Sequence, residues 1–223
     1  MDIKQRYLQT FINIARNIAQ LSTCAYRNVG AIIVKDNRIV SEGFNGTVSG
    51  FIHCIDVDSV LQHCVERVFR DKDDKVTELP TKLEQCIQSR LTQKLKTGHK
   101  YLSEIVSEFA RRQLESLIKS DTSVNDLRYM LSSPIYRKQL NWIHVNRLDV
   151  HAEMNAITFA AKHGSSLDSA VLISTHVPCV DCLKAIVSTG IRKIYYAELY
   201  NDNTIYTETV SLARLLNVEL IKV

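Results

Sequence analysis

Three residues with metal-binding side chains lie in two short motifs in the last third of the chain. His151 opens the string His151-Ala152-Glu153, and Cys179 and Cys182 lie three positions apart in Pro178-Cys179-Val180-Asp181-Cys182. Zinc prefers thiolate and imidazole ligands arranged as a tetrahedron. Two thiolates with this spacing at a helix start can face one point, where the positive end of the helix dipole favours their deprotonated forms. We therefore predict a zinc site formed by His151, Cys179 and Cys182.

Glu153 is the acid–base candidate of this site. Three protein ligands leave the fourth position open for water, which is typical of catalytic zinc. Glu153 lies two residues from His151, so it can stand beside that water without binding the metal and can transfer protons. Either motif alone is weak, because Cys-x-x-Cys is also common in structural zinc sites and redox pairs. A structural site would need a fourth protein ligand, and the nearest one, His176, is interpreted as a loop or core residue.

The elements that must position these motifs form an alternating pattern of strands and helices. The predicted helices span 3–19, 151–163, 179–189 and 206–216, and the predicted strands span 29–34, 38–44, 170–175, 192–197 and 218–223. Strand–helix–strand crossovers usually make the strands parallel. We therefore expect a hairpin followed by two βα units in one five-stranded sheet, with helices on both faces. Residues 59–145 show helical spacing, so we expect one domain, 1–223, with a helical insertion at about 57–148.

Composition and charge restrict the class of protein. Apolar residues make up 45% of the 223 residues and charged residues 23%, as in soluble globular proteins. No apolar run approaches the roughly 18 residues of a membrane span, and the N-terminus lacks a signal peptide's apolar segment, so we expect a cytoplasmic protein without a membrane partner. The six cysteines are then expected to be free thiols or metal ligands. The net charge of +4 lies in residues 61–140, which hold 15 bases and 11 acids.

Four stretches of the chain together resemble those of one enzyme family. They are Val29–Val34, Gly43–Gly46, His151–Ile157 and Pro178–Ile186. The His-x-Glu and Pro-Cys-x-x-Cys pair is the signature of zinc nucleobase deaminases. The Phe44-Asn45-Gly46 turn and the string His151–Ile157 narrow the resemblance to the deoxycytidylate (dCMP) deaminases, particularly the phage type, within the zinc-dependent cytidine deaminase superfamily. The resemblance covers about half of the chain and implies a cytidine-deaminase-like three-layer α/β/α fold with a five-stranded mixed sheet.

The resemblance also implies a reaction and its partners. It implies zinc-dependent hydrolytic deamination of dCMP to dUMP and ammonia in pyrimidine deoxynucleotide synthesis, with Glu153 transferring protons. Asn45 and Ala152 are expected to contact the substrate, Asn45 at the deoxyribose. The alternative for Asn45-Gly46 is an ordinary hairpin exit, since Asn and Gly are favoured in turns for backbone reasons alone. Because a 5′-phosphate needs cationic or amide donors, Arg27 is its predicted ligand, although a solvated surface charge is an equal alternative. Relatives are commonly homo-oligomers, dimers or hexamers, that dCTP activates and dTTP inhibits; a viral protein would act in the host cytoplasm.

A second, structural zinc is implied by the same resemblance. Cys24 and Cys54 lie just outside the two ends of the predicted hairpin, which brings these ends together. Phage-type relatives hold this zinc with two Cys, a His and a carboxylate, so His144 and Asp149 are the expected remaining ligands. His53 and His63 are alternative donors. Cys24 and Cys54 could equally be small buried apolar residues, as free cysteines often are.

Two other functions remain open at this point. A polynucleotide deaminase, acting on tRNA or single-stranded DNA, would use the basic insertion as its platform and would carry aromatic residues among the bases. Residues 81–128 contain only Tyr101 and Phe109 as aromatics, which favours a small substrate and makes a nucleic-acid partner unlikely. A non-catalytic zinc scaffold would have no need of Glu153, which is not a predicted ligand.

Overall fold

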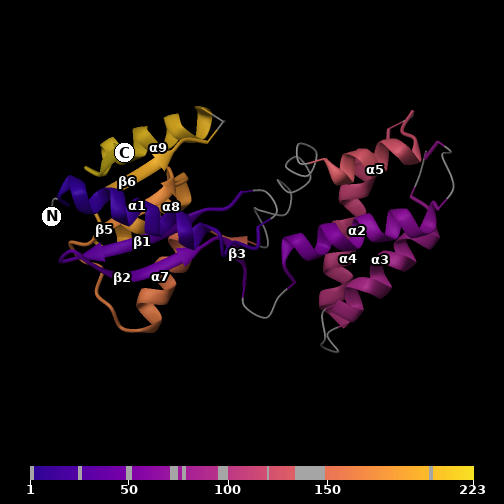
Figure 1. Cartoon of the computed structure of the whole chain (residues 1–223), viewed down its shortest axis with the longest axis horizontal. Helices are drawn as coiled ribbons and strands as arrows, with labels where there is room; N and C mark the ends of the chain where they lie inside the picture. The colour runs from indigo at the N-terminus through magenta and orange to yellow at the C-terminus, as the bar shows by residue number, and fades with distance from the viewer. Residues whose placement is uncertain are drawn as a thin grey trace. The chain divides into compact units, whose positions relative to one another are not determined.

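The chain folds into two compact units in the computed structural model (Figure 1). The structure describes residues 3–24, 27–48, 52–70, 75–76, 79–94, 100–119, 121–133, 149–200 and 203–223. The α/β unit consists of Met1–Ser22, Arg27–Gly46 and Val150–Val223, and the helical unit consists of Thr23–Tyr26 and Thr47–Asp149. We describe each unit by itself.

The α/β unit is built on one mixed sheet of five strands. These are β1 (Gly30–Lys35), β2 (Arg38–Phe44), β5 (Val171–His176), β6 (Lys193–Glu198) and β7 (Glu219–Lys222), in the order β2-β1-β5-β6-β7. Strand β1 is antiparallel to β2 and β5, whereas β5, β6 and β7 are parallel. The helices α8 (Val180–Ser188) and α9 (Asn203–Leu215) make the two crossovers that parallel strands require. The predicted hairpin, crossovers and mixed sheet are confirmed.

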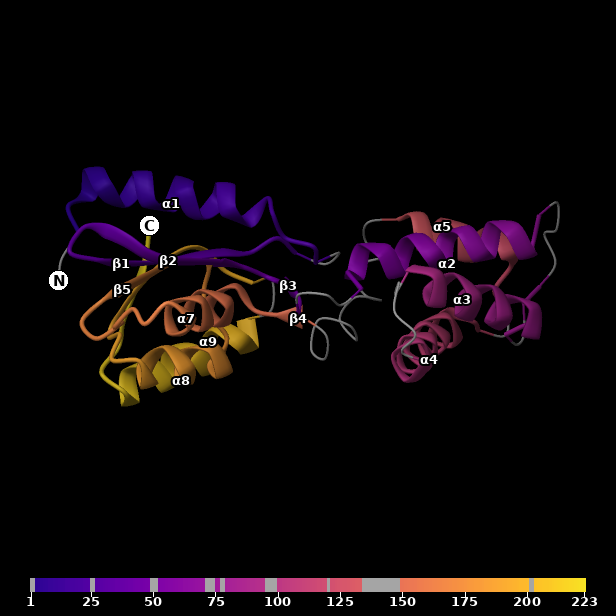
Figure 2. The same ribbon diagram turned by 90° about the horizontal axis from the view of Figure 1, so that it is seen from below.

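Helices cover both faces of this sheet (Figure 2). Helix α1 (Gln5–Ala19) packs on the face that presents Ile32 and Ile173. Helices α7 (Ala152–Lys162), α8 and α9 pack on the face that presents Ile33 and Leu172. Neighbouring strand residues point to opposite faces, so the fully buried strands supply side chains to both cores. The predicted three-layer α/β/α architecture is confirmed.

Close packing fixes α7, the helix that follows His151, against strand β2. A Cβ atom at Gly43 would lie 2.3 Å from a carbonyl oxygen of the α7 backbone, so only glycine allows this approach. Ser41 Oγ donates a hydrogen bond to the Ala156 carbonyl at 2.5 Å. Asn155 Nδ2 donates one to the Phe44 carbonyl at 2.7 Å. The start of α7 is therefore held rigidly to the sheet.

The helical unit has its own apolar core. Helices α2 (Cys54–Val68), α3 (Thr81–Lys94), α4 (Lys100–Leu117) and α5 (Val124–Ser132) surround it. Its fully buried side chains include Leu61, Leu83, Leu91, Leu114 and Leu127. The helical spacing of 59–145 thus gives separate helices, and α2 begins before the predicted start. The end of the predicted stretch, 134–148, lies outside the described residues.

A small second sheet joins β3 (Gly46–Thr47) and β4 (Asp149–Val150). The sequence did not predict it, because a strand of two residues shows no alternation of apolar and polar positions. Within the described part of the chain, no helix has both the length and the apolar character that a membrane crossing requires.

Candidate active site

The three predicted metal ligands lie together at the starts of two helices of the α/β unit. His151 is the N-cap residue of α7, Cys179 is the N-cap residue of α8, and Cys182 lies in the first turn of α8. His151 Nδ1 is 3.5 Å from Cys179 Sγ and 3.3 Å from Cys182 Sγ. Among the described residues, this is the group of three donors whose ligand atoms all lie within 4.8 Å of one another.

The protonation of the two thiols fits a metal cation. A hydrogen bond with Cys182, and a second one with His151, lower the pKa of Cys179 to about 4. The hydrogen bond with Cys179, together with burial, raises the pKa of Cys182. The pair therefore holds one thiolate readily, and a cation would displace the remaining proton. A donor set of one imidazole and two sulfurs is the set that zinc prefers.

Glu153 lies beside this cluster and is almost fully buried. Its side chain is 2% exposed, and its Oε1 has no hydrogen-bond partner among the described residues. Burial raises the pKa of this carboxyl group. Buried carboxylate oxygens without a partner are costly, so this one marks a place for a bound group. This position agrees with a proton-transfer role for Glu153, because its free oxygen is not occupied by a hydrogen bond within the protein.

The predicted substrate residues lie on three elements: Arg27 on the segment before β1, Asn45 directly after β2, and Ala152 at the start of α7. Asn45 is 6% exposed, and its Oδ1 accepts hydrogen bonds from Val29 N and Ser22 Oγ, both at 2.8 Å. Its Nδ2 donates one to the Arg27 carbonyl at 2.7 Å. Asn45 therefore holds the backbone that carries Arg27. Ala152 is fully buried in a small apolar cluster with Val29.

Sequence reasoning missed Tyr200, which lies near the cluster. The guanidinium carbon of Arg27 is 4.9 Å from the centroid of the Tyr200 ring. Burial and the negative charges of Glu153 and the two cysteines raise the pKa of the Tyr200 hydroxyl well above its usual value. Tyr200 follows the end of β6, and the carboxyl ends of parallel strands are where open α/β sheets bind ligands. That topological signal could have identified it.

The residues predicted for a second zinc lie in the helical unit. Cys54 Sγ donates a hydrogen bond to Asp149 Oδ1 at 3.0 Å, and Asp149 Oδ2 is buried without a partner among the described residues. Burial, then the Asp149 hydrogen bond and charges including that of Cys24, raise the pKa of Cys54. These described donors do not form a group of three within 4.8 Å. His144 lies outside the described residues.

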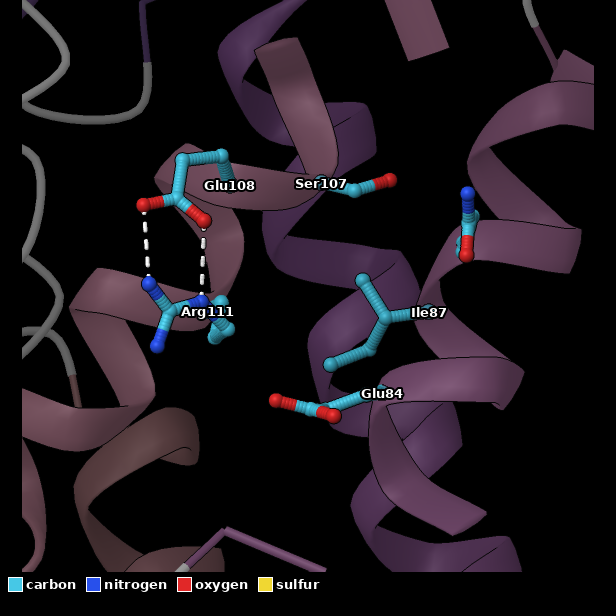
Figure 3. A pocket seen from close by; sticks show the side chains of 6 residues that line it. Glu84, Ile87, Ser107, Glu108 and Arg111 are labelled. Atoms are coloured by element: carbon cyan, nitrogen blue, oxygen red, sulfur yellow. Dashed lines mark hydrogen bonds and ion pairs between the residues drawn. The ribbon is translucent and has the colours of Figure 1, made fainter. Parts of the chain in front are cut away.

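Two cavities described in the helical unit are not lined by Cys54 or Asp149. One, of about 210 Å³, is lined by Glu84, Ile87, Gln88, Ser107, Glu108 and Arg111 (Figure 3). There Arg111 donates two hydrogen bonds to Glu108, at 2.8 and 2.9 Å, and this interaction lowers the pKa of Glu108 to about 2. The other, of about 410 Å³, is lined by His63, Glu66, Arg67, Arg70 and Arg90.

Comparisons with known proteins agree with this geometry. Residues 125–198 match the family model of the cytidine and deoxycytidylate deaminase zinc-binding region. The deoxycytidylate deaminase of Enterobacteria phage T2 is 30% identical over 194 residues, which cover 87% of this chain and 81% of that protein. ComE operon protein 2 of Bacillus subtilis (strain 168) is 24% identical over 197 residues, or 87% of this chain and 61% of that protein. The crystal structure of dCMP deaminase from the cyanophage S-TIM5, in complex with dCMP and dUMP, covers 100% of both chains with a TM-score of 0.55 and 23% identity.

The fold and the His–Cys–Cys cluster define a zinc-dependent deaminase of the cytidine deaminase type. The sequence identity of 30% to the phage T2 enzyme, over most of both chains, narrows this class to one family. The chain belongs to the deoxycytidylate deaminase family. The resemblance seen in the four sequence stretches is thus confirmed.

Proposed function

We propose that the protein hydrolyses dCMP to dUMP and ammonia. The observation that carries this proposal is the buried Glu153 carboxylate, with an unpartnered oxygen, beside the cluster of His151, Cys179 and Cys182. Family membership supports the reaction, since relatives at about 30% identity are named deoxycytidylate deaminases. A non-catalytic scaffold offers no reason to bury this carboxylate.

His151, Cys179 and Cys182 would hold the zinc ion. Zinc bound there supplies a Lewis acid that activates water at neutral pH. Glu153 accepts a proton from the water and donates it to N3 of the pyrimidine, so that the water oxygen can bond to C4. Glu153 then transfers the second proton to the amino group, the C4–N4 bond breaks, and ammonia leaves. The raised pKa of Glu153 suits a group that must both accept and donate a proton.

The nucleotide contacts follow from the segment before β1. Arg27 is the cation proposed to bind the 5′-phosphate, and charge-assisted hydrogen bonds of this kind are the strong ones. Asn45 is proposed to contact the deoxyribose, and Ala152 the base. The amide nitrogen of Asn45 carries two hydrogens, of which the bond to the Arg27 carbonyl uses one. The same residue can therefore hold Arg27 and contact the sugar.

A spectrophotometric assay tests this function directly. The fall in ultraviolet absorbance on deamination is followed with dCMP, cytidine, dCTP and a single-stranded oligonucleotide. We expect dCMP to have the highest kcat/KM. A higher value for the oligonucleotide would support the polynucleotide deaminase, and no turnover of any of the four by zinc-loaded protein would favour the scaffold.

A second zinc is proposed in the helical unit, with Cys24, Cys54 and Asp149 as ligands and His144 as the fourth. The Cys54–Asp149 contact and the unpartnered Asp149 oxygen support it. Metal analysis should give two zinc ions per chain in the wild type and one in Cys24→Ser. The matched variant Cys86→Ser, outside both clusters, should keep two. One zinc ion per wild-type chain would contradict the second site.

We also propose a homo-oligomer, a dimer or hexamer, whose turnover dCTP increases and dTTP decreases. Resemblance to the family supports this proposal. Light scattering measures the mass of the assembly, and dCMP assays below KM with each nucleotide measure the effect. A monomer that responds to neither nucleotide would contradict it.

A further inference from the structure

His176 and Glu198 meet at the carboxyl edge of the sheet, three residues before Cys179. His176 is the last residue of β5 and pairs with Glu198, the last residue of β6. The side chain is 9% exposed, so the imidazole is a buried group at the end of a strand. The proposed mechanism does not use it. The sequence predicted a loop or core residue at this position, and that prediction does not say what a buried imidazole does at this edge.

Both ring nitrogens of His176 have partners that fix the ring. Nδ1 lies 3.1 Å from the hydroxyl oxygen of Thr175, and Nε2 lies 3.4 Å from a carboxylate oxygen of Glu198. Burial, and then the positive charge of Arg27, lower the pKa of His176 to about 4, against the opposing effect of Glu198. The imidazole is therefore neutral at physiological pH and does not add a second positive charge near Arg27.

The fixed ring supports a tyrosine, and the tyrosine contacts a cation. The rings of His176 and Tyr200 are stacked, with centroids 5.5 Å apart and planes 30° apart. The guanidinium of Arg27 lies over the same tyrosine ring, 4.9 Å from its centroid. A cation over an aromatic face is attracted by the ring's quadrupole. The chain of contacts thus runs from Glu198 and Thr175 through His176 and Tyr200 to Arg27.

We infer that His176 is a positioning residue that fixes the Tyr200 ring, and through it the guanidinium of Arg27, for binding of the nucleotide phosphate. The inference rests on the proposed function, in which Arg27 binds that phosphate. It assigns His176 to nucleotide affinity, and not to proton transfer or zinc binding. A nucleoside, which lacks the phosphate, should be insensitive to the same change.

The first test separates affinity for the phosphate from chemistry. His176→Ala removes the stacked ring and should raise the KM for dCMP and the Kd for the product dUMP about tenfold, the size expected for loss of one well-placed cation contact. We expect kcat for dCMP, the constants for deoxycytidine and the zinc content to be unchanged. His176→Phe keeps a ring for stacking and should restore most of the affinity. His163→Ala, an exposed histidine at the end of α7, is the matched control and should change nothing.

A double-mutant cycle then asks whether His176 acts through Arg27. Isothermal titration calorimetry with dUMP is compared for wild type, His176→Ala, Arg27→Ala and the double variant. If His176 acts through Arg27, its removal should cost nothing further once Arg27 is absent. An equal loss in both backgrounds, or an equal loss for deoxycytidine, would overturn the inference while leaving the proposed function intact. Wild-type protein that neither deaminates dCMP nor binds dUMP would instead overturn the proposed function, and this inference with it.

Discussion

The α/β unit and the helical unit use their charged and polar residues differently. In the α/β unit, Glu153 and His176 are buried at the ends of elements, and each has a pKa shifted by burial. In the helical unit, the ion pairs that Arg111 makes with Glu108 and Glu115 lie on the exposed face of α4, around a core of leucines. Buried groups with shifted pKa values are typical of catalytic sites, whereas exposed ion pairs contribute little to stability. The comparison assigns the deamination chemistry to the first unit. In the second unit, the buried Cys54, whose pKa is also raised by burial, belongs to the proposed structural zinc site.

Of the substitutions that test this comparison, the one at Glu153 should have the largest effect on turnover. Glu153→Gln removes the carboxylate proposed to accept and donate protons but leaves the three proposed zinc ligands untouched. We expect kcat for dCMP to fall about 10²–10⁴-fold, the usual contribution of general acid–base catalysis. Zinc content and the unfolding midpoint should match the wild type. A variant that kept more than about a tenth of the wild-type rate would contradict the assigned role.

The sequence predicted the two units to different extents, because their residue patterns differ. In the α/β unit, strands β1, β5 and β6 are short apolar runs bounded by turn residues, so their predicted bounds agree with the structure to about one residue. The metal cluster was predictable because His151 and Cys179 carry metal-binding side chains at predicted helix starts. The contact of Tyr200 with His176 was not predictable, because the stacking of these two rings depends on side-chain packing at the ends of β5 and β6, which the sequence pattern does not show.

In the helical unit, the sequence predicted helical structure but not the separate helices. Apolar spacing continues across residues 59–145, and the breaks between α2, α3 and α4 depend on how these helices pack. The contact of Cys54 with Asp149 joins residues 95 positions apart. Local patterns cannot predict such a pair, and the resemblance to a family suggested it instead.

A second test asks whether the two cores are energetically separate. Leu172 in β5 and Leu114 in α4 are both fully buried, and truncating either to alanine should cost about 2–5 kcal/mol. Hydrogen exchange measured by mass spectrometry should show faster exchange in the strands for Leu172→Ala and in α2–α5 for Leu114→Ala. Leu215→Ala, at a position that is 79% exposed, is the matched control and should change neither. If either core variant speeds exchange equally in both units, the units do not unfold separately.

A smaller effect is expected where α7 approaches β2. Gly43→Ala places a methyl group 2.3 Å from a backbone oxygen of α7, so the helix that follows His151 must move. Overpacking of this kind typically costs about 1–3 kcal/mol, and we expect weaker zinc retention against a chelator. Gly164→Ala is the control, since its added methyl group meets open space and strains only the local backbone at a φ of +68°. Equal zinc loss in the two variants would show that close packing at Gly43 does not position the site.

The smallest expected effect concerns the positive charge of the helical unit. Arg67, Arg70 and Arg90 line the 410 Å³ cavity with His63 and Glu66, and none of these lining residues is Phe, Tyr or Trp. Proteins that bind single strands combine basic grooves with aromatic side chains on which the bases stack. We therefore expect an oligonucleotide of single-stranded DNA to bind weakly at moderate salt, and substitution of the three arginines by glutamine to leave kcat/KM for dCMP unchanged.

Fluorescence anisotropy at two salt concentrations measures that binding for the wild type and the triple glutamine variant. Binding that depends on many phosphate contacts loses about 10³–10⁵-fold in affinity between 50 and 200 mM salt. Tight binding with such a steep loss, abolished by the three substitutions, would show that the helical unit is a nucleic-acid platform. Assigning the deamination chemistry to the α/β unit alone would then be wrong, because the buried Glu153 and the three arginines would act on one polynucleotide substrate. Weak binding that the substitutions leave unchanged would instead support a helical unit whose charged residues form a solvated surface around its apolar core.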